Sequence, residues 1–421
     1  KVTRYTYDAY GNMLTKTDAL GRIRSYTYDQ MGRIVTDTDH RGAVTRKTYD
    51  ALGRLLTITD PLGGVTTNEY DGNGNKIAET DAAGRRTTYN FNVLNQMTDG
   101  TTIEYTYDFR GNPLTEKDQE GHTRTFVYDK AGQLTKIVNP DNTEIKTTYD
   151  AIGRVTRRVD ERGNTMTYEY DPSCGCSERV AKITDALGRS STYTFDAAGR
   201  RSAIIDANNR ETRYTRDARG RVTVVTFPDN TTTSRTYDAE GRVTSMTDQG
   251  GKVTKYSYDE AGSMVSVTDA LNHTTTYAYD PNGNLLTQAD ANGRSTRFEY
   301  DALNRKIKRV LPLGMSELYT YDQVGNMVTL ADFRGKQMSY DYDPLNRLVA
   351  RTPDPTLNEP KISFTYTPTG ERATMTDASG TTTYTYDSLH RLTQKSTPQG
   401  TLNYTYDAAG NLLSTLSSNT N

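Results

Sequence analysis

Hydrophobic and polar positions alternate along short stretches of the chain with a period of two residues. In residues 3–7, Tyr5 and Tyr7 share one face, and Arg4 and Thr6 share the other. A second kind of stretch, at residues 13–17, 55–59 and 243–247, is rich in threonine and aliphatic side chains, which suit a pleated, half-buried surface. No stretch sustains the i, i+3, i+4 apolar spacing of a helix. The pattern therefore predicts an all-β protein with almost no helix.

The two kinds of stretch recur in register along the whole chain. The marker of each repeat is the aromatic residue, or its substitute, that precedes an aspartate; it falls at positions 7, 28, 49, 70, 91, 107, 128, 149, 170, 195, 216, 237, 258, 279, 300, 321, 342, 366, 386 and 406. These are 20 units, and the step between most neighbours is 21 residues. Self-similarity at a fixed period is the signature of a repeat protein. Each unit is therefore predicted to form two strands and two turns.

A recurring Asp-x-x-Gly segment separates the predicted strands. We interpret the aspartate as an acceptor for backbone N–H groups and the glycine as the residue with positive φ that closes the turn. Asparagine, which tolerates this conformation, replaces the glycine at positions 95, 209, 272, 304 and 346, and His390 is another substitute. The structural repeat positions that we single out are Tyr7, Asp8, Gly11, Asp18, Gly21, Tyr28, Asp29, Gly32, Tyr49, Asp50, Gly53, Tyr237, Asp238, Gly241, Tyr279, Asp280 and Gly283.

About forty strands at roughly 4.8 Å spacing would form a ribbon of sheet on the order of 190 Å long. A twisting sheet of that length does not stay flat. A β-propeller with two repeat units in each four-stranded blade would need ten blades, which exceeds the usual four to eight. We therefore expect a continuous winding β-ribbon, as a spiral, a solenoid or a partial hollow shell. Residues 1–421 are expected to be a single repeat array, with irregular connections near 92–106, 171–192 and 350–363.

Composition narrows the classes of partner. The 51 basic and 53 acidic residues are spread evenly and give a net charge of −2, which indicates no nucleic-acid partner and no anionic membrane surface. No run of apolar residues is long enough for a transmembrane span. With 31 Tyr and only 8 Phe, the core is expected to be thin and one-sided.

The sequence offers no catalytic constellation, so we expect no enzyme, no cofactor and no metal site. His40, His122, His273 and His390 are scattered over predicted turns, and none has a cysteine or second histidine at metal-ligand spacing. Stacked acidic turns leave weak calcium binding as a minor alternative. Cys174 and Cys176 form a possible local thiol pair; an irregular turn is favoured, with a strained disulfide or an intermolecular link as alternatives.

The repeated motif Y-D-x-x-G-[NR], followed about ten residues later by D-x-x-G-[RN], resembles the RHS or YD-repeat family over essentially the whole chain. The resemblance implies a β-ribbon that spirals into a hollow shell. In the bacterial polymorphic toxins and insecticidal toxin complexes of the family, that shell encloses a C-terminal toxin; in teneurins, a related barrel belongs to an extracellular adhesion protein. Shells of this kind use more residues than this chain has, so we expect a segment of a longer protein.

The leading hypothesis is a non-enzymatic shell segment of a secreted or cell-surface bacterial RHS-repeat protein. Its partner would be a toxin or another polypeptide cargo from the same longer protein. The alternative is an open extracellular solenoid, stalk or filament, which would associate end to end through its edge strands and act in adhesion or glycan binding.

Overall fold

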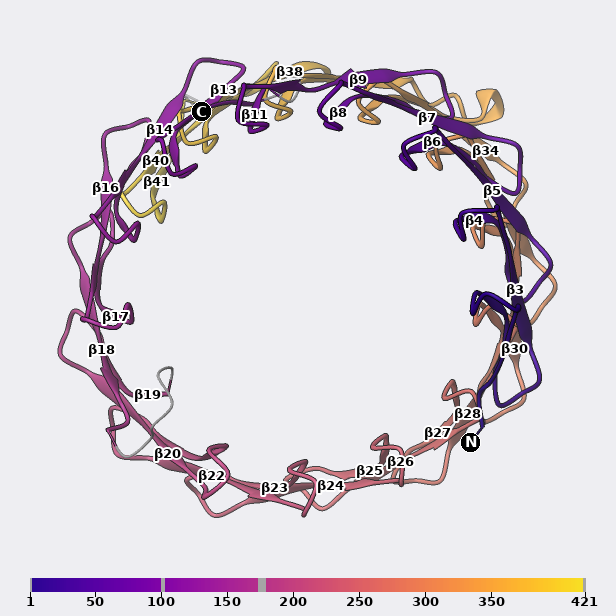
Figure 1. Cartoon of the computed structure of the whole chain (residues 1–421), viewed down its shortest axis with the longest axis horizontal. Helices are drawn as coiled ribbons and strands as arrows, with labels where there is room; N and C mark the ends of the chain where they lie inside the picture. The colour runs from indigo at the N-terminus through magenta and orange to yellow at the C-terminus, as the bar shows by residue number, and fades with distance from the viewer. Residues whose placement is uncertain (1, 100–102, 173–178, 419–421) are drawn as a thin grey trace. The chain divides into compact units, whose positions relative to one another are not determined.

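The computed structural model describes residues 2–99, 103–172 and 179–418 (Figure 1). Over these residues the chain folds into antiparallel β-strands with one short 3₁₀ helix, η1 (Pro355–Leu357), and no α-helix. The predicted all-β fold class is confirmed.

In both sheets the order of the strands follows the sequence. The first sheet contains β1 (Arg4–Tyr7), β2 (Met13–Thr17), β3 (Ile23–Tyr28), β4 (Ile34–Thr38), β5 (Val44–Tyr49), β6 (Leu55–Thr59), β7 (Val65–Tyr70), β8 (Lys76–Thr80) and β9 (Arg86–Thr88). The second sheet contains β10 (Asn90–Phe91), β11 (Met97–Asp99), β12 (Ile103–Tyr107), β13 (Pro113–Asp118), β14 (Thr123–Tyr128), β15 (Leu134–Val138), β16 (Glu144–Tyr149), β17 (Val155–Val159), β18 (Thr165–Tyr170), β19 (Val180–Thr184), β20 (Ser190–Phe195), β21 (Arg201–Ile205), β22 (Glu211–Arg216), β23 (Val222–Thr226), β24 (Thr232–Tyr237), β25 (Val243–Thr247), β26 (Val253–Tyr258), β27 (Met264–Thr268), β28 (Thr274–Tyr279), β29 (Leu285–Ala289), β30 (Ser295–Tyr300), β31 (Lys306–Val310), β32 (Ser316–Tyr321), β33 (Met327–Ala331), β34 (Gln337–Tyr342), β35 (Leu348–Thr352), β36 (Ile362–Tyr366), β37 (Arg372–Asp377), β38 (Gly380–Tyr386), β39 (Leu392–Thr397), β40 (Gly400–Tyr406) and β41 (Leu412–Ser417).

Each repeat unit is a hairpin with a register shift at its marker tyrosine. In the hairpin of β3 and β4, Thr27 lies opposite Thr36, whereas Tyr28 lies opposite Ile34, so the shift falls between Thr27 and Tyr28. The same shift recurs before the marker in the hairpins that begin with β5, β14, β24 and β32. A bulge of this kind increases local twist. The pattern of alternation in the sequence does not reveal it.

The chain divides into two compact units. Unit 1 comprises Lys1–Thr101, Tyr256–Thr365 and Thr374–Thr381, and unit 2 comprises Thr102–Lys255, Tyr366–Ala373 and Thr382–Asn421. Each unit thus combines an early segment of the chain with a late one. In unit 1, the indigo strands near β3 lie beside the orange strands near β30 (Figure 1), and side chains of Arg41 and Asn304 meet between them.

The core is very thin. Only Ala78, Ala203, Ala350 and Pro353 are buried apolar residues among those described, and no large side chain is fully buried. Most side chains of the strands are half-buried, so a unit has no closed core of its own. Hydrogen bonds along the sheet and at the turns contribute to the local order.

The three stretches expected to be irregular remain an interpretation of the sequence. Near residues 350–363, the helix η1 follows β35, and the Asp354 side chain accepts a hydrogen bond from the Thr356 amide. The first sheet ends at β9 and the second begins at β10, on either side of Tyr89. The possible thiol pair of Cys174 and Cys176 lies outside the described residues.

Substituting Gly63 by alanine is expected to lower the free energy of unfolding by about 1–2 kcal/mol. Gly63 has φ +87°, and a Cβ added there would meet nothing within 4 Å, so the cost is conformational. Gly72, which has equally open space but lies outside the left-handed region, is the matched control; its alanine variant should be neutral or slightly stabilising. Chemical denaturation of both variants tests this, and equal losses would contradict it.

Candidate functional site

The turn aspartates bind the backbone of their own turns. Asp29 accepts hydrogen bonds at Oδ1 from the amides of Met31 (2.9 Å) and Arg33 (3.0 Å), and its Oδ2 accepts from Arg33 Nε at 2.7 Å. Five other turn aspartates accept a hydrogen bond at Oδ1 from the amide four residues further along the chain: Asp8, Asp18, Asp50, Asp238 and Asp280.

The glycines and their substitutes close these turns in the left-handed region. The backbone φ lies between 77° and 91° at Gly11, Gly21, Gly32, Gly53, Gly241 and Gly283. It lies between 58° and 66° at Asn95, Asn209, Asn272, Asn304, Asn346 and His390. The predicted backbone geometry of the turns is therefore confirmed at these positions.

Hydrogen bonding lowers the pKa of several turn carboxyl groups, among them Asp29 and Asp50. The pKa of Asp29 is held below its usual value, chiefly by the backbone hydrogen bond from Arg33. At Asp50, burial raises the pKa, but the backbone and side-chain hydrogen bonds from Arg54 outweigh it, and the pKa is lowered overall. These carboxylates are therefore charged and bonded at neutral pH.

The marker tyrosine joins each unit to the one before it. The hydroxyl of Tyr49 donates to the carbonyl oxygen of Ile34 at 2.9 Å. The guanidinium of Arg33 lies 4.8 Å from the centre of the Tyr49 ring, and its Nη1 donates to the carbonyl oxygen of Asp50 at 3.1 Å. At other markers the tyrosine hydroxyl likewise donates to the carbonyl oxygen of the residue fifteen positions earlier; these are Tyr28, Tyr70, Tyr149, Tyr170, Tyr237, Tyr279, Tyr300, Tyr321 and Tyr342.

Sequence reasoning missed this role of the arginine. The residue after the turn glycine was part of the repeated motif, but it had no assigned function. Arg54, Arg221 and Arg305 repeat the arrangement of Arg33, each donating to the carbonyl oxygen of the next unit's aspartate. The recurrence of arginine at this position was the available signal.

Replacing Tyr237 by phenylalanine is expected to lower the free energy of unfolding by about 1 kcal/mol, because it removes one neutral hydrogen bond. Its hydroxyl donates to the Val222 carbonyl at 2.7 Å. Tyr10, at a turn tip and 92% exposed, is the matched control, and Y10F should change stability little. Thermal and chemical denaturation give the comparison; a Y237F variant as stable as Y10F would contradict the role of this hydroxyl.

In unit 1, the early and late segments meet through their turns. The guanidinium of Arg41 lies 3.4 Å from Asp280 Oδ2, and Asn282 Nδ2 donates to Asp39 Oδ2 at 2.6 Å. Arg22 also donates to the backbone carbonyl of Asp280, at 3.4 Å. In the early segment, the contacting turns follow the second strand of a hairpin. In the late segment, the contacting turn begins with a Tyr-Asp pair and connects the two strands of a hairpin. We call these contacts the unit 1 interface.

In unit 2, the same two kinds of turn meet. Arg162 Nη1 lies 3.0 Å from Asp407 Oδ2, and Arg391 Nη2 lies 3.8 Å from Asp141 Oδ2. We call these contacts the unit 2 interface. In both interfaces, charged side chains bind residues about 250 positions away in the sequence.

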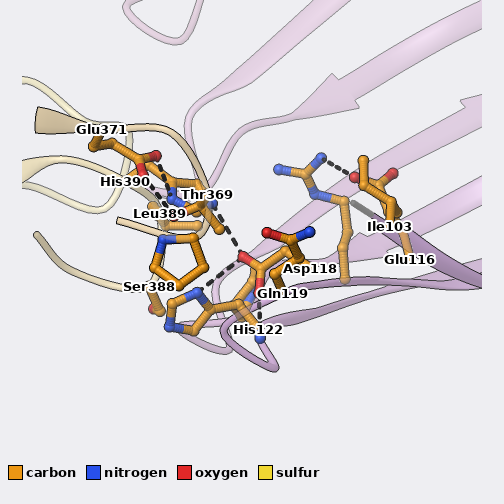
Figure 2. A pocket seen from close by; sticks show the side chains of 13 residues that line it. Ile103, Glu116, Asp118, Gln119, His122, Thr369, Glu371, Ser388, Leu389 and His390 are labelled. Carbon is orange, nitrogen blue, oxygen red and sulfur yellow. Dashed lines mark hydrogen bonds and ion pairs between the residues drawn. The ribbon is translucent and has the colours of Figure 1, made fainter. Parts of the chain in front are cut away.

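A cavity of about 400 Å³ lies at the unit 2 interface and holds a cluster of titratable side chains (Figure 2). His390 Nε2 lies 3.2 Å from Asp118 Oδ2, and His390 Nδ1 lies 2.8 Å from Glu371 Oε1. His122 Nδ1 lies 3.0 Å from the same Asp118 Oδ2. The two imidazole rings are 5.7 Å apart in an edge-to-face arrangement.

The structure brings together two of the histidines that are scattered along the sequence. His122 and His390 are far apart in the sequence, but with Asp118 they present ligand atoms that all lie within 4.8 Å of one another. His273 instead meets Asp269 of its own turn, at 3.0 Å, and is 63% exposed. The spacing of these residues along the sequence does not reveal the cluster, because its members come from different turns of the ribbon.

Two family models match the chain. The teneurin YD-shell model matches residues 38–174 and 229–367, and the RHS repeat model matches residues 7–41, 179–210, 202–232 and 366–402. Comparison with curated protein sequences gives no significant match.

Solved structures of toxin complexes have the same fold. A crystal structure of TcdB2-TccC3-Cdc42 is 13% identical with a TM-score of 0.66, over 99% of this chain and 29% of the other. A structure of TcdB2-TccC3 without its hypervariable C-terminal region is 15% identical with a TM-score of 0.55, with the same coverage of both chains. The Photorhabdus luminescens Tc holotoxin pore is 16% identical with a TM-score of 0.51, over 96% of this chain and 27% of that one. The chain thus spans less than a third of the length of these proteins.

Proposed function

The chain belongs to the teneurin YD-shell family, and from this premise we propose that it is a non-enzymatic segment of a β-shell that encloses a polypeptide cargo. The cargo would be a toxin or another part of the same longer protein. The RHS repeats and the shared fold with the Tc toxin complexes support this proposal. The protein would be secreted or exposed at a bacterial cell surface. Among the described residues, no helix is long and apolar enough to cross a membrane.

The observation that carries the proposal is the way each unit is completed by its neighbours. Tyr49 and Arg33 bind the adjacent units, while the interior of the array holds almost no buried apolar side chain. A unit of this kind has no core of its own and is stable only within an array. Such a construction builds an extended sheet.

The turns expose apolar side chains that suit an unfolded polypeptide. Large apolar residues stand at turn tips with most of their surface exposed, among them Tyr10 (92%), Leu52 (77%), Leu187 (76%), Leu271 (75%) and Leu313 (87%). With a net charge of −2, the array also lacks a strong field that would select one sign of charge in the cargo.

Protease protection tests the proposal. The full reading frame is expressed, and the segment that follows the repeats is digested under native conditions, in parallel with the same segment expressed alone. We expect the segment in the full protein to resist digestion for much longer. Equal rates of digestion would contradict enclosure, and so would a reading frame that continues only into further repeats or a wall anchor.

A further inference from the structure

We propose that Asp118, His122 and His390 form a binding site for one divalent transition-metal ion of the zinc class. The site lies within unit 2, where the turn after β13 meets the turn after β38. Two of its ligands come from positions 118 and 122 of one turn, and the third comes from position 390 of the other. The bound ion would join the two segments of the unit 2 interface.

The distances in the cluster are close to those of a metal polyhedron. Zinc binds imidazole nitrogen and carboxylate oxygen at about 2.0–2.2 Å, and tetrahedral angles then place neighbouring ligand atoms about 3.4 Å apart. Asp118 Oδ2 already lies 3.0 Å from His122 Nδ1 and 3.2 Å from His390 Nε2. All the ligand atoms lie within 4.8 Å of one another.

Glu371 prepares His390 as a ligand. Its Oε1 lies 2.8 Å from His390 Nδ1, and its Oε2 accepts hydrogen bonds from the hydroxyls of Thr367 and Thr369, both at 2.5 Å. Glu371 therefore occupies one ring nitrogen and fixes the orientation of the imidazole. The other ring nitrogen, Nε2, lies 3.2 Å from Asp118 Oδ2. Carboxylate–histidine–zinc arrangements have this form, with one ring nitrogen bound to a carboxylate and the other available to the metal.

The donor set selects the class of metal. Two imidazole nitrogens and one carboxylate oxygen suit zinc and the neighbouring transition metals, whereas calcium and magnesium require oxygen ligands. Three protein ligands leave one position open, and the cavity of about 400 Å³ gives water access to it.

Metal titration of the tag-free chain tests the proposal. The protein, with Cys174→Ser and Cys176→Ser to remove the two thiols, is stripped with a chelator and titrated at neutral pH with Zn²⁺ by calorimetry and with Co²⁺ by absorption. We expect one ion per chain and a Co²⁺ spectrum with nitrogen and oxygen ligands. Zn²⁺ should also raise the melting temperature.

Two variants give the decisive comparison. His390→Asn keeps a residue that tolerates the φ of +61° at this position, as Asn304 does at the equivalent turn position, and it should raise the Kd for Zn²⁺ at least about 100-fold. His273→Gln is the control, because His273 and Asp269 repeat the 3.0 Å pair of His122 and Asp118; its Kd should equal that of the parent.

The proposal is overturned if the thiol-free chain binds no Zn²⁺ while circular dichroism shows that it is folded. It is also overturned if His390→Asn binds Zn²⁺ as tightly as the parent. Glu371→Gln provides a further check, since loss of a positioning carboxylate should raise the Kd about 10- to 100-fold and leave the stoichiometry unchanged.

Discussion

Asp280→Ala is expected to lower the free energy of local opening in unit 1 by roughly 3 kcal/mol, the range for removing one member of a nearly buried ion pair. The Asp280 side chain is only 8% exposed, and Arg41, its partner at 3.4 Å, is 24% exposed. The variant leaves the Arg41 guanidinium without this carboxylate. It also removes the acceptor for the amides of Asn282 and Asn284, which now bind Oδ1 at 2.9 and 2.8 Å.

Asp71 is the matched control because its turn has the same bonds. The amides of Asn73 and Asn75 donate to Asp71 Oδ1 at 2.9 Å, and Asn75 Nδ2 donates to Oδ2 at 2.8 Å, as Asn284 Nδ2 does to Asp280. What distinguishes Asp280 is its contact with Arg41 at the unit 1 interface. Asp71→Ala should therefore cost less than Asp280→Ala, and the difference measures that contact.

Hydrogen exchange is the appropriate measurement here, because it reports the opening of individual strands, whereas denaturation reports on the array as a whole. We expect faster exchange in β28 and β29 of the Asp280→Ala variant, and also in β4 and β5, which flank the turn of Arg41. Faster exchange confined to β28 and β29 would show that the contact with Arg41 contributes little. Equal effects of the two substitutions would contradict the prediction outright.

The local structure of this protein follows from its sequence because its determinants are local. Strands predicted at residues 13–17, 55–59 and 243–247 coincide with β2, β6 and β25. The substitution of glycine by Asn304 or His390 predicts positive φ, and the structure has 62° and 61° at these positions. Each inference needed only a period of two residues, a turn and the conformational preference of one residue type.

Contacts between distant segments do not follow from the same pattern. Which turn of the early segment meets Asp280 or His390 depends on twist accumulated over many hairpins, and the register shift beside each marker tyrosine contributes to that twist. A small change in twist per unit, summed over the array, would bring a different pair of turns together. The cluster of His122 and His390 was therefore missed, although both turns were predicted.

Acid is expected to destabilise the whole array. The pKa values of several turn carboxyl groups, among them Asp18, Asp29 and Asp50, are lowered in the folded protein. In the unfolded chain an aspartate has a pKa of about 3.9, so the unfolded state binds more protons in acid. The stabilisation is fully present above that pH and is lost as pH falls through the folded-state values. The most strongly shifted groups, Glu144 and Asp354, have pKa values of about 2.

The melting temperature should accordingly be nearly constant between about pH 7 and pH 5 and fall steeply between about pH 4 and pH 2. Each exposed carboxylate contributes little by itself, and salt screens its ion pair; the effect is large because the turn repeats in almost every unit. Thermal scans at constant, moderate salt give the profile. A melting temperature that stays level down to pH 2 would contradict the role of the carboxylates.

Asparagine variants separate titration from turn geometry. Asn92 shows that asparagine supports this turn, since its Oδ1 accepts from the amides of Leu94 and Gln96 at 2.9 and 3.0 Å. A triple variant, D29N with D50N and D238N, should be less stable than the parent at neutral pH, because it loses three ion pairs with arginine. It should also take up fewer protons on unfolding, so its melting temperature should fall less steeply with acid. An unchanged slope would mean that these turns are held by their backbone geometry and not by the charge of their aspartates.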